Sequence, residues 1–462
     1  MKLLKKITIL VFCIILLVPI FTFNMKKDAI SEIDNRVLAE NPLTVESSED
    51  FTTNMENYIN DRIGLRNEMI LAYTVLNDKL FGKMVHPSYT YGQDGYVFGA
   101  GLEANVRYNE FHEVFADMVK MIQDYCEERD IPFLFVFNPA KPAIMKEYIA
   151  EGINYQREWV DKFLAALDER GVRYLDNTET LKNAKEAGIE VFNKKYDANH
   201  WNDLGAYYGT NAMLEELKKD IPTVHVNTEE DMEVTEVREE SLLVSKFPID
   251  EMVPVVSIYN ELESRTDLFA DELELNESYR GFGYYLNPER IEEGSPKALV
   301  FQGSYMNGYG YKYLQNAFGE YIYVHDYQNI LNFPYYYNIF KPDCVIFEVA
   351  EYTFADSYFN LEKMKTLDFQ STYKSMLEDS EVSGEYFPLE SVEVEEGKIL
   401  TKINWSQNES LEQTWLFMGD EEYDLMRNET GYTVTVLTEE YQKYKDELKL
   451  AGLSNGMMLY WK

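Results

Sequence analysis

The stretch Phe133-Leu134-Phe135-Val136-Phe137 is continuously apolar and stops at Asn138-Pro139. An unbroken apolar run is typical of a strand that is buried on both faces of a parallel sheet. The residues before it, from Tyr108, predict a helix because apolar side chains recur at spacings of three and four: Phe111, Phe115, Met118, Ile122 and Tyr125. A helix followed directly by a buried strand indicates an α/β architecture.

The same alternation continues along the chain. A second amphipathic helix contains Trp159, Phe163 and Leu167, ends near Gly171, and precedes a short strand at 172–175. Further strands are predicted at 298–302, 321–324 and 344–349, with a helix at 311–318. The predicted fold class is therefore α/β, with a flavodoxin-like parallel sheet covered by helices on both faces.

Composition and periodicity divide the chain into segments. Residues 1–27 form an apolar N-terminal segment, and 28–105 form an N-terminal extension. The α/β domain is expected over 106–366, with a β-rich insertion at about 220–296, where Val, Glu and Asp are frequent and the helical period is weak. Residues 367–462 are expected to form a linker and a small β-rich accessory domain, since stretches such as 433–437 alternate.

The N-terminal segment predicts a membrane anchor. Lys2, Lys5 and Lys6 precede an apolar run from Ile7 to Phe23, which is at the short end for a membrane-spanning helix. No small-residue cleavage site follows it, which favours an uncleaved signal anchor over a cleaved signal peptide. We expect a single-pass protein of the cell membrane with its body outside the cytoplasm, or a secreted protein if the segment is cleaved.

The composition argues against nucleic acid as a partner and indicates neither a disulfide scaffold nor a metal site. The chain has 462 residues, with 81 acidic against 43 basic ones, and its formal charge of -38 repels nucleic acid. Its three cysteines do not indicate a disulfide scaffold, and no Cys/His cluster has metal-ligand spacing. Neither a metal nor another cofactor is predicted.

Two motifs carry candidate catalytic residues. Asp197 stands three residues before His200, so its carboxylate can accept the Nδ1 proton and leave Nε2 to face a nucleophile; a loop histidine that caps the next helix is the alternative. Ser304, in Gly303-Ser304-Tyr305, directly follows an apolar strand, and a strand-to-helix turn would expose its hydroxyl; an ordinary serine-containing turn is the alternative.

A third candidate lies at the end of strand 344–349, where two glutamates, Glu348 and Glu351, are unusual unless exposed or used. His325, which closes strand 321–324, is a rival base, although a supporting or substrate-contacting role is the preferred interpretation.

The order of these motifs resembles the SGNH/GDSL hydrolases in a circularly permuted form, as in the AlgJ/AlgX-type alginate O-acetylation proteins and the related DHHW proteins. The strand at 133–137 and the Asp197–His200 motif come first, and Ser304 comes later. Similar N-terminal segments are Asp34-Asn35-Arg36-Val37-Leu38 and the run from Asn60 to Arg66, so the resemblance extends over roughly 34–354.

The resemblance implies a catalytic triad of Ser304, His200 and Asp197 in an O-acetyltransferase that works beside an integral-membrane acyltransferase. The chain departs from the family at Ala198, where an Asp is usual, and at Gln302-Gly303 before the serine. The oxyanion Asn of ordinary SGNH enzymes would fall near Glu351, and an ionised Glu cannot donate a hydrogen bond. The remaining candidates are Tyr352, Asn307 and backbone groups.

The chain is rich in tyrosine, with 36 residues, and tyrosine rings can stack on sugars as well as pack in a core. The full set of candidate oxyanion or substrate-binding residues is Tyr305, Asn307, His325, Tyr327, Glu351, Tyr352 and Trp201. The leading hypothesis is serine-dependent acyl transfer, most simply acetyl transfer, onto a cell-surface or secreted polysaccharide. A polysaccharide O-acetylesterase with the same residues and a catalytically decayed glycan-binding scaffold of an export complex are the alternatives.

Overall fold

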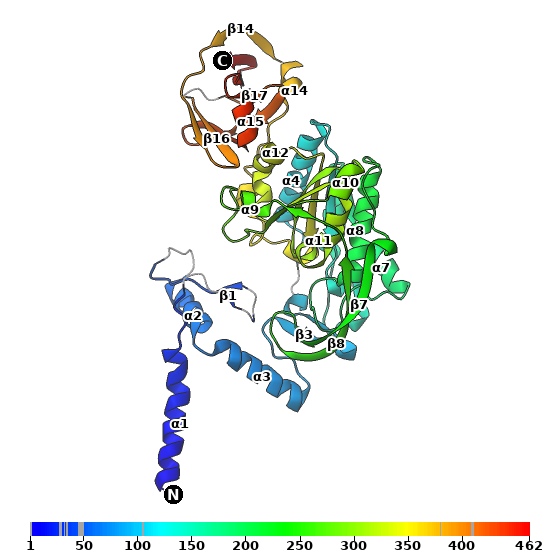
Figure 1. The fold of residues 1–462 in the computed structure, drawn as a ribbon. Coiled ribbons are helices and arrows are strands. Elements are labelled where there is room, and N and C mark those ends of the chain that lie inside the picture. The colour runs from blue at the N-terminus through cyan, green and yellow to red at the C-terminus, as the bar shows by residue number, and fades with distance from the viewer. Residues whose placement is uncertain are drawn as a thin grey trace.

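The computed structural model describes residues 2–26, 30–31, 33, 36–44, 50–103, 106–378, 380–407 and 411–462. Helix α1 (Lys2–Phe21) projects away from the rest of the chain (Figure 1). Between Leu3 and Phe21 it is long and apolar enough to cross a membrane, and no part of that span is buried against the protein. A signal sequence has the same properties, so the helix fits either an anchor or a signal peptide.

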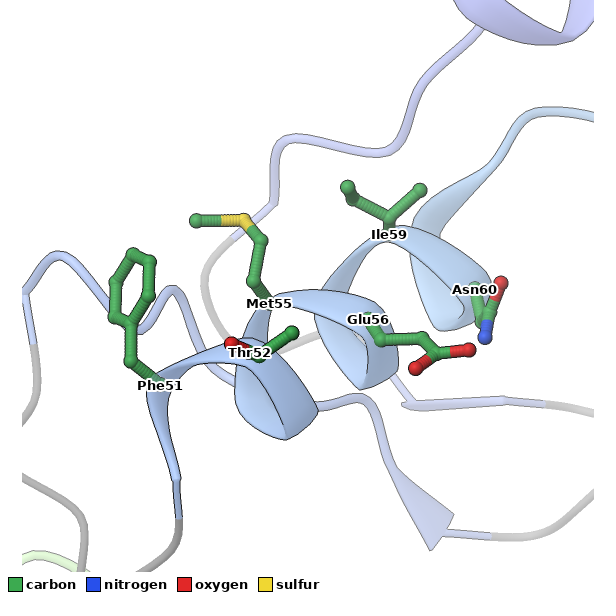
Figure 2. Close-up of a pocket in the computed structure, with 6 residues that line it drawn as sticks. All are labelled: Phe51, Thr52, Met55, Glu56, Ile59 and Asn60. Atoms are coloured by element: carbon green, nitrogen blue, oxygen red, sulfur yellow. The ribbon is translucent and has the colours of Figure 1, made fainter.

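Two helices, α2 (Phe51–Arg62) and α3 (Arg66–Phe81), connect α1 to the body of the protein. The Gly64 N–H donates to the Pro19 carbonyl at 2.9 Å, which attaches the α2–α3 turn to the end of α1. A short pair, β1 (Ile30–Ser31) and β2 (Arg36–Val37), lies nearby; Asp34 and Asn35, which carry part of the N-terminal resemblance, lie outside the described residues. The exposed face of α2 carries Phe51, Met55 and Ile59 around a shallow pocket (Figure 2).

The main sheet has seven strands and confirms the predicted fold class. Its order is β6 (Tyr174–Asp176), β5 (Phe133–Asn138), β13 (Cys344–Ala350), β11 (Lys297–Gln302), β12 (Glu320–His325), β10 (Phe282–Leu286) and β9 (Glu263–Ser264). The first five strands are parallel, and β10 and β9 are antiparallel to their neighbours. The carboxyl ends of the parallel strands therefore meet at one edge, where open α/β sheets bind their ligands.

Helices cover both faces of this sheet (Figure 1). Phe133, Phe135 and Phe137 pack on the side of α4 (Glu110–Glu127), α6 (Glu158–Glu169) and α12 (Phe333–Phe340). Leu134 and Val136 pack on the side of α7 (Thr178–Glu186), α8 (Asp203–Lys218) and α11 (Tyr311–Ala317). Every side chain of β5 is buried, which is why its sequence is apolar without alternation.

The segment expected as a β-rich insertion divides into two parts. Its first part is a two-stranded antiparallel ribbon, β7 (Met232–Ser241) with β8 (Pro248–Ile258). Its second part does not stand apart from the sheet, because β9 and β10 extend the main sheet beyond β12. A hairpin of β3 (Tyr89–Tyr91) and β4 (Val97–Gly99) packs against the ribbon through Leu242 and Phe247.

The C-terminal segment folds as a β-rich domain, as expected from its sequence. One sheet contains β14 (Glu381–Phe387), β22 (Met457–Trp461), β21 (Lys449–Ser454), β17 (Gln413–Met418) and β18 (Glu421–Asp424). The other contains β15 (Val392–Glu396), β16 (Leu400–Ser406), β20 (Gly431–Leu437) and β19 (Met426–Arg427), with α15 (Thr438–Tyr444) following β20. A buried ion pair of 2.8 Å between Arg129 on the α/β domain and Asp424 joins the two domains.

The remaining helices are short: α5 (Lys141–Ile144), α9 (Thr266–Phe269), α10 (Pro288–Glu292), α13 (Leu361–Met364) and α14 (Tyr373–Glu378).

Candidate active site

Ser304 lies at the carboxyl edge of the main sheet, in the turn that follows β11. The chain enters helical geometry at the serine, passes through a π-helical turn (Met306–Gly310) and continues as α11. Single π-turns inside helices occur frequently at functional sites. The Gly303 N–H donates to the Glu348 carboxyl at 2.9 Å, which fixes the start of the turn.

His200 and Asp197 meet Ser304 from the loop before α8. The His200 Nε2 lies 2.9 Å from the Ser304 Oγ, and the His200 Nδ1 lies 2.9 Å from the Asp197 Oδ2. The carboxylate is itself oriented, because the backbone N–H groups of Asn199 and His200 both donate to the Asp197 Oδ1 at 3.0 Å. The structure thus places a continuous hydrogen-bonded chain of carboxylate, imidazole and hydroxyl.

The electrostatics of this chain favour an ionised Asp197. Burial opposes ionisation, but the adjacent His200 and the backbone N–H donors outweigh it and lower the pKa of Asp197 to about 2. Burial works against the charged imidazole, and Asp197 outweighs it, so the pKa of His200 is raised. An ionised Asp197 accepts the proton on Nδ1, which leaves the Nε2 lone pair free to accept from the Ser304 hydroxyl.

Tyr352 completes the immediate surroundings of the serine. Its hydroxyl contacts the Ser304 Oγ and lies 3.2 Å from the His200 Nε2. Burial of the hydroxyl raises the pKa of Tyr352, so the group stays protonated and can donate at neutral pH. Because Ser304 donates to His200, its oxygen is available to accept from Tyr352.

Glu351, expected near the oxyanion position, has a different role in the structure. Its carboxylate pairs with the Arg157 Nε at 2.9 Å and accepts from the Tyr155 hydroxyl at 2.8 Å and the Ala140 N–H at 3.0 Å. Both carboxylate oxygens of Glu351 therefore accept hydrogen bonds, and these bonds connect the end of β13 to the segment after β5. The neighbouring Tyr352 faces Ser304 instead.

The other sequence candidates divide into lining and packing residues. Asn307 lines the pocket beside Ser304, and its side-chain oxygen accepts from Gln302 at 2.7 Å. Trp201 and Tyr305 are buried, and the Trp201 ring N–H donates to the Tyr305 carbonyl at 3.1 Å. His325 and Tyr327 pack against each other in an aromatic cluster, with 4.5 Å between their ring centroids, and neither lines this pocket.

Two further side chains support Asp197, and sequence reasoning did not single them out. The Tyr309 hydroxyl donates to the Asp197 Oδ2 at 3.0 Å. The fully buried Lys141 donates to the carbonyls of Val97 at 2.8 Å and Asp197 at 3.0 Å, and burial lowers its pKa to about 8. A lysine just after the apolar run at 133–137 was the only sequence signal for this contact.

A second pair of carboxyl groups lies beneath the serine turn. Glu348 and Asp326 are both fully buried, and a Cβ atom at Gly303 would meet an Asp326 oxygen at 3.5 Å and a Glu348 oxygen at 3.8 Å. Burial, with Asp326 nearby, raises the pKa of Glu348 to about 8, and burial raises that of Asp326 to about 6. The Asn138 side chain donates to Glu348 at 2.7 Å, so Glu348 is held from two sides.

The pocket above Ser304 has a volume of about 500 Å³. It is lined by Ser304, His200, Asp197, Tyr309 and Asn307, and also by Glu239 and Pro254 of the β7–β8 ribbon and by Leu243 in the loop that joins the two strands. No group of three or more His, Cys, Asp or Glu side chains in the described parts of the chain is arranged to hold a metal ion. The arrangement suits nucleophilic catalysis at an ester, because a hydroxyl, a base and an orienting carboxylate are in line.

Comparison with known proteins gives one family match. Residues 90–271 match the family described as "SGNH hydrolase-like domain, acetyltransferase AlgX". The matched stretch contains Asp197 and His200 and ends before Ser304. No curated protein sequence matches the chain.

Solved structures with a similar arrangement include three bacterial proteins. A DHHW family protein from Eubacterium siraeum has 14% identity and a TM-score of 0.42, with 62% of this chain and 97% of that chain covered. The O-acetyltransferase domain of Pseudomonas putida AlgJ has 15% identity and a TM-score of 0.42, with 60% and 99% covered. Pseudomonas aeruginosa AlgX has 13% identity and a TM-score of 0.38, with 75% and 86% covered.

Proposed function

We propose that this protein is an extracytoplasmic O-acyltransferase that moves an acetyl group onto a cell-surface or secreted polysaccharide through an acyl-Ser304 intermediate. The observation that carries the proposal is the hydrogen-bonded chain from Asp197 through His200 to Ser304, with 2.9 Å at the serine. The family match supports acetyl transfer as the chemistry. The intact chain of hydrogen bonds weighs against the alternative of a decayed, non-enzymatic scaffold.

In the first half-reaction the Ser304 oxygen attacks the carbonyl carbon of an acetyl donor while His200 Nε2 takes the hydroxyl proton. The carbonyl oxygen becomes an oxyanion, and we assign the Tyr352 hydroxyl, which contacts the Ser304 Oγ, and the Ser304 backbone N–H as its hydrogen-bond donors. His200 then returns the proton to the leaving group, and the acetyl-serine remains. Asp197 stabilises the imidazolium between these two proton transfers.

In the second half-reaction a sugar hydroxyl enters from the side of the departed group and gives its proton to His200 Nε2. The hydroxyl oxygen attacks the acetyl carbonyl, and the proton then returns to Ser304 as the sugar ester leaves. Water in place of the sugar would make the protein an O-acetylesterase, and the same residues serve both reactions. We propose that α1 anchors the protein in the cell membrane beside an integral-membrane acyltransferase that supplies acetyl groups.

The decisive experiment is intact mass measurement after incubation with a small activated acetyl ester, on the wild type and on Ser304→Ala. We expect the mass of one acetyl group on the wild type alone. Addition of oligosaccharides then separates transfer, which produces acetylated sugar, from hydrolysis, which produces acetate. Equal adduct formation, or equal ester turnover, in the two proteins would refute the serine mechanism.

A further inference from the structure

The β7–β8 ribbon and the loop that joins its strands form one wall of the pocket above Ser304, beside the proposed catalytic residues. Glu239, Leu243, Val253, Pro254 and Val255 line that wall. A substrate group that exchanges a proton with His200 Nε2 from this pocket comes within reach of this wall. In acyl transfer the leaving alcohol and the accepting alcohol both exchange a proton with the same base, so both occupy this space.

The ribbon is fastened to the proposed catalytic loop. The Glu251 carboxylate on β8 accepts from the backbone N–H groups of Lys194, Lys195 and Tyr196 at 2.6, 2.9 and 2.6 Å. These residues lead directly into Asp197. Asp203, at the start of α8, accepts from the Val256 N–H at 2.7 Å, which holds the other end of the wall. The wall therefore has a fixed position relative to His200 and Ser304.

Glu239 stands directly opposite Glu251 in the register of the ribbon, so the two carboxylates share one face. Like charges directly opposite each other destabilise a strand pair. Glu251 offsets this cost through its three N–H donors, whereas the half-buried Glu239 carboxylate makes no hydrogen bond or ion pair with a side chain in the described part of the structure. The register also shifts between Glu239 and Ser241, and such bulges re-aim side chains beside active sites.

The charge of the pocket is one-sided. Its described lining contains the carboxylates of Asp197, Asp203 and Glu239, and no lysine or arginine. Asp203 is neutralised by Lys312 at 2.8 Å, and Asp197 is paired with His200, which leaves Glu239 as the uncompensated charge. The whole chain, at a formal charge of -38, adds a negative background.

We propose that Glu239 is a specificity-determining residue, which accepts a hydrogen bond from a hydroxyl of an uncharged sugar and rejects a sugar that bears a carboxylate. A carboxylate is an acceptor only, so it requires a donor, and neutral sugars present donor hydroxyls at every ring position. Val255, which is partly exposed and lies on the same face of the ribbon as Glu239, gives the C–H face of a sugar ring an apolar surface to pack on. The inference rests on the proposed acyl transfer, because it concerns the acceptor of that reaction.

The test uses two acetyl esters that differ only in charge beside the reacting group: methyl 3-acetoxybenzoate, which is neutral, and 3-acetoxybenzoate, which carries a carboxylate. Turnover by the full-length protein is measured as kcat/KM at low ionic strength and divided by the alkaline hydrolysis rate of each ester. We expect the wild type to favour the neutral ester about threefold to tenfold, with a smaller preference in added salt, as for one unit charge near a partly buried carboxylate.

The variants Glu239→Gln and Glu239→Lys test the residue itself. The first should reduce the preference for the neutral ester, and the second should abolish or invert it. Glu236→Lys makes the same change of charge on the same ribbon, at an exposed position that does not line the pocket, and should leave the preference near the wild-type value. Two acceptors of equal length are then compared: a β-1,4-linked oligomer of mannose, which is neutral, and one of mannuronic acid, which is charged. We expect acetylated product from the neutral oligomer alone.

The outcomes are distinguishable. Equal or faster turnover of the carboxylate ester by the wild type, or an equal effect of Glu239→Lys and Glu236→Lys, would overturn the role of Glu239 and leave the serine mechanism intact. Turnover of both esters that persists in Ser304→Ala would instead overturn the proposed function.

Discussion

Replacing Tyr352 with phenylalanine removes one oxygen atom from the site and little else. The ring of Tyr352 contacts the rings of His200 and Tyr305, with centroids 6.1 and 6.0 Å apart, and phenylalanine preserves these contacts. The hydroxyl contacts the Ser304 Oγ and lies 3.2 Å from the His200 Nε2. The substitution therefore tests whether this hydroxyl donates to the oxyanion of the reaction.

The magnitude follows from the position of the hydroxyl. A donor aimed at a developing oxyanion contributes about 3–4 kcal/mol, so Tyr352→Phe should lower kcat by about 100-fold to 1,000-fold. The oxyanion forms in the transition state and the tetrahedral intermediate and is absent from the bound ester, so KM should change little. Since Tyr352 is 38% exposed and its ring is retained, the free energy of unfolding should fall by less than about 1 kcal/mol.

The assay is burst kinetics with a chromogenic acetyl ester, in which the acylation rate is read directly from the first turnover. Tyr155→Phe is the matched control, because it removes a hydroxyl that donates to Glu351 and not to the serine. We expect the control to acylate within about threefold of the wild type. An acylation rate of Tyr352→Phe that is equally close to the wild type would refute the assignment of Tyr352 as an oxyanion donor.

Three more predictions follow from the same network and from the N-terminus. Asp197→Asn should lower kcat by about 1,000-fold to 10,000-fold and move the acidic limb of the kcat/KM profile to lower pH, because Asp197 raises the pKa of His200; an unmoved limb would contradict this. Burial raises the pKa of Asp326 to about 6, so the free energy of unfolding should fall as pH rises from about 4 to 6, by at most ~1.4 kcal/mol per pH unit. Asp326→Asn should therefore stabilise the protein at pH 8 more than at pH 4. Thermal unfolding measures this effect, and Asp161→Asn, at an exposed position, is the control. Deletion of residues 1–26 should move the protein from the membrane fraction to the soluble fraction with its esterase activity retained, and a deletion variant that still sediments with membranes would contradict the anchor.

The strands of the main sheet were predictable because a strand that is buried on both faces has an uninterrupted apolar sequence. The run at 133–137 is apolar without alternation, and β5 is buried at every position. Strands of this kind need no information about distant residues. The extension of the sheet by β9 and β10 was missed for the opposite reason: these are short strands whose place depends on pairing with β12 and with each other, and pairing is not encoded locally.

The supporting contacts of the site were beyond sequence reasoning for a related reason. Glu351 forms an ion pair with Arg157, which lies 194 positions earlier in the chain. Sequence patterns do not reveal a partner at that separation, so Glu351 could not be distinguished from an unpaired carboxylate. Lys141 is equally opaque, since its partners are backbone carbonyls, which every residue carries. By contrast, Asp197 and His200 are only three residues apart, and this spacing was enough to predict their hydrogen bond. In the structure the His200 Nδ1 lies 2.9 Å from the Asp197 Oδ2.

The order of the motifs along the chain has a structural consequence for the pocket. His200 and Ser304 are 104 positions apart, yet both lie at the carboxyl edge of one sheet, so the chain between them must leave the site and return to it. On its way it forms the ribbon that lines the pocket, and it then adds β10 and β9 beside β12. The segment that separates His200 from Ser304 in sequence thus contributes to the lining of the pocket that contains both residues. A change at a ribbon side chain that only lines the pocket, such as Glu239, would alter which molecules reach Ser304, whereas a change at Glu251 would also disturb the loop that leads into Asp197.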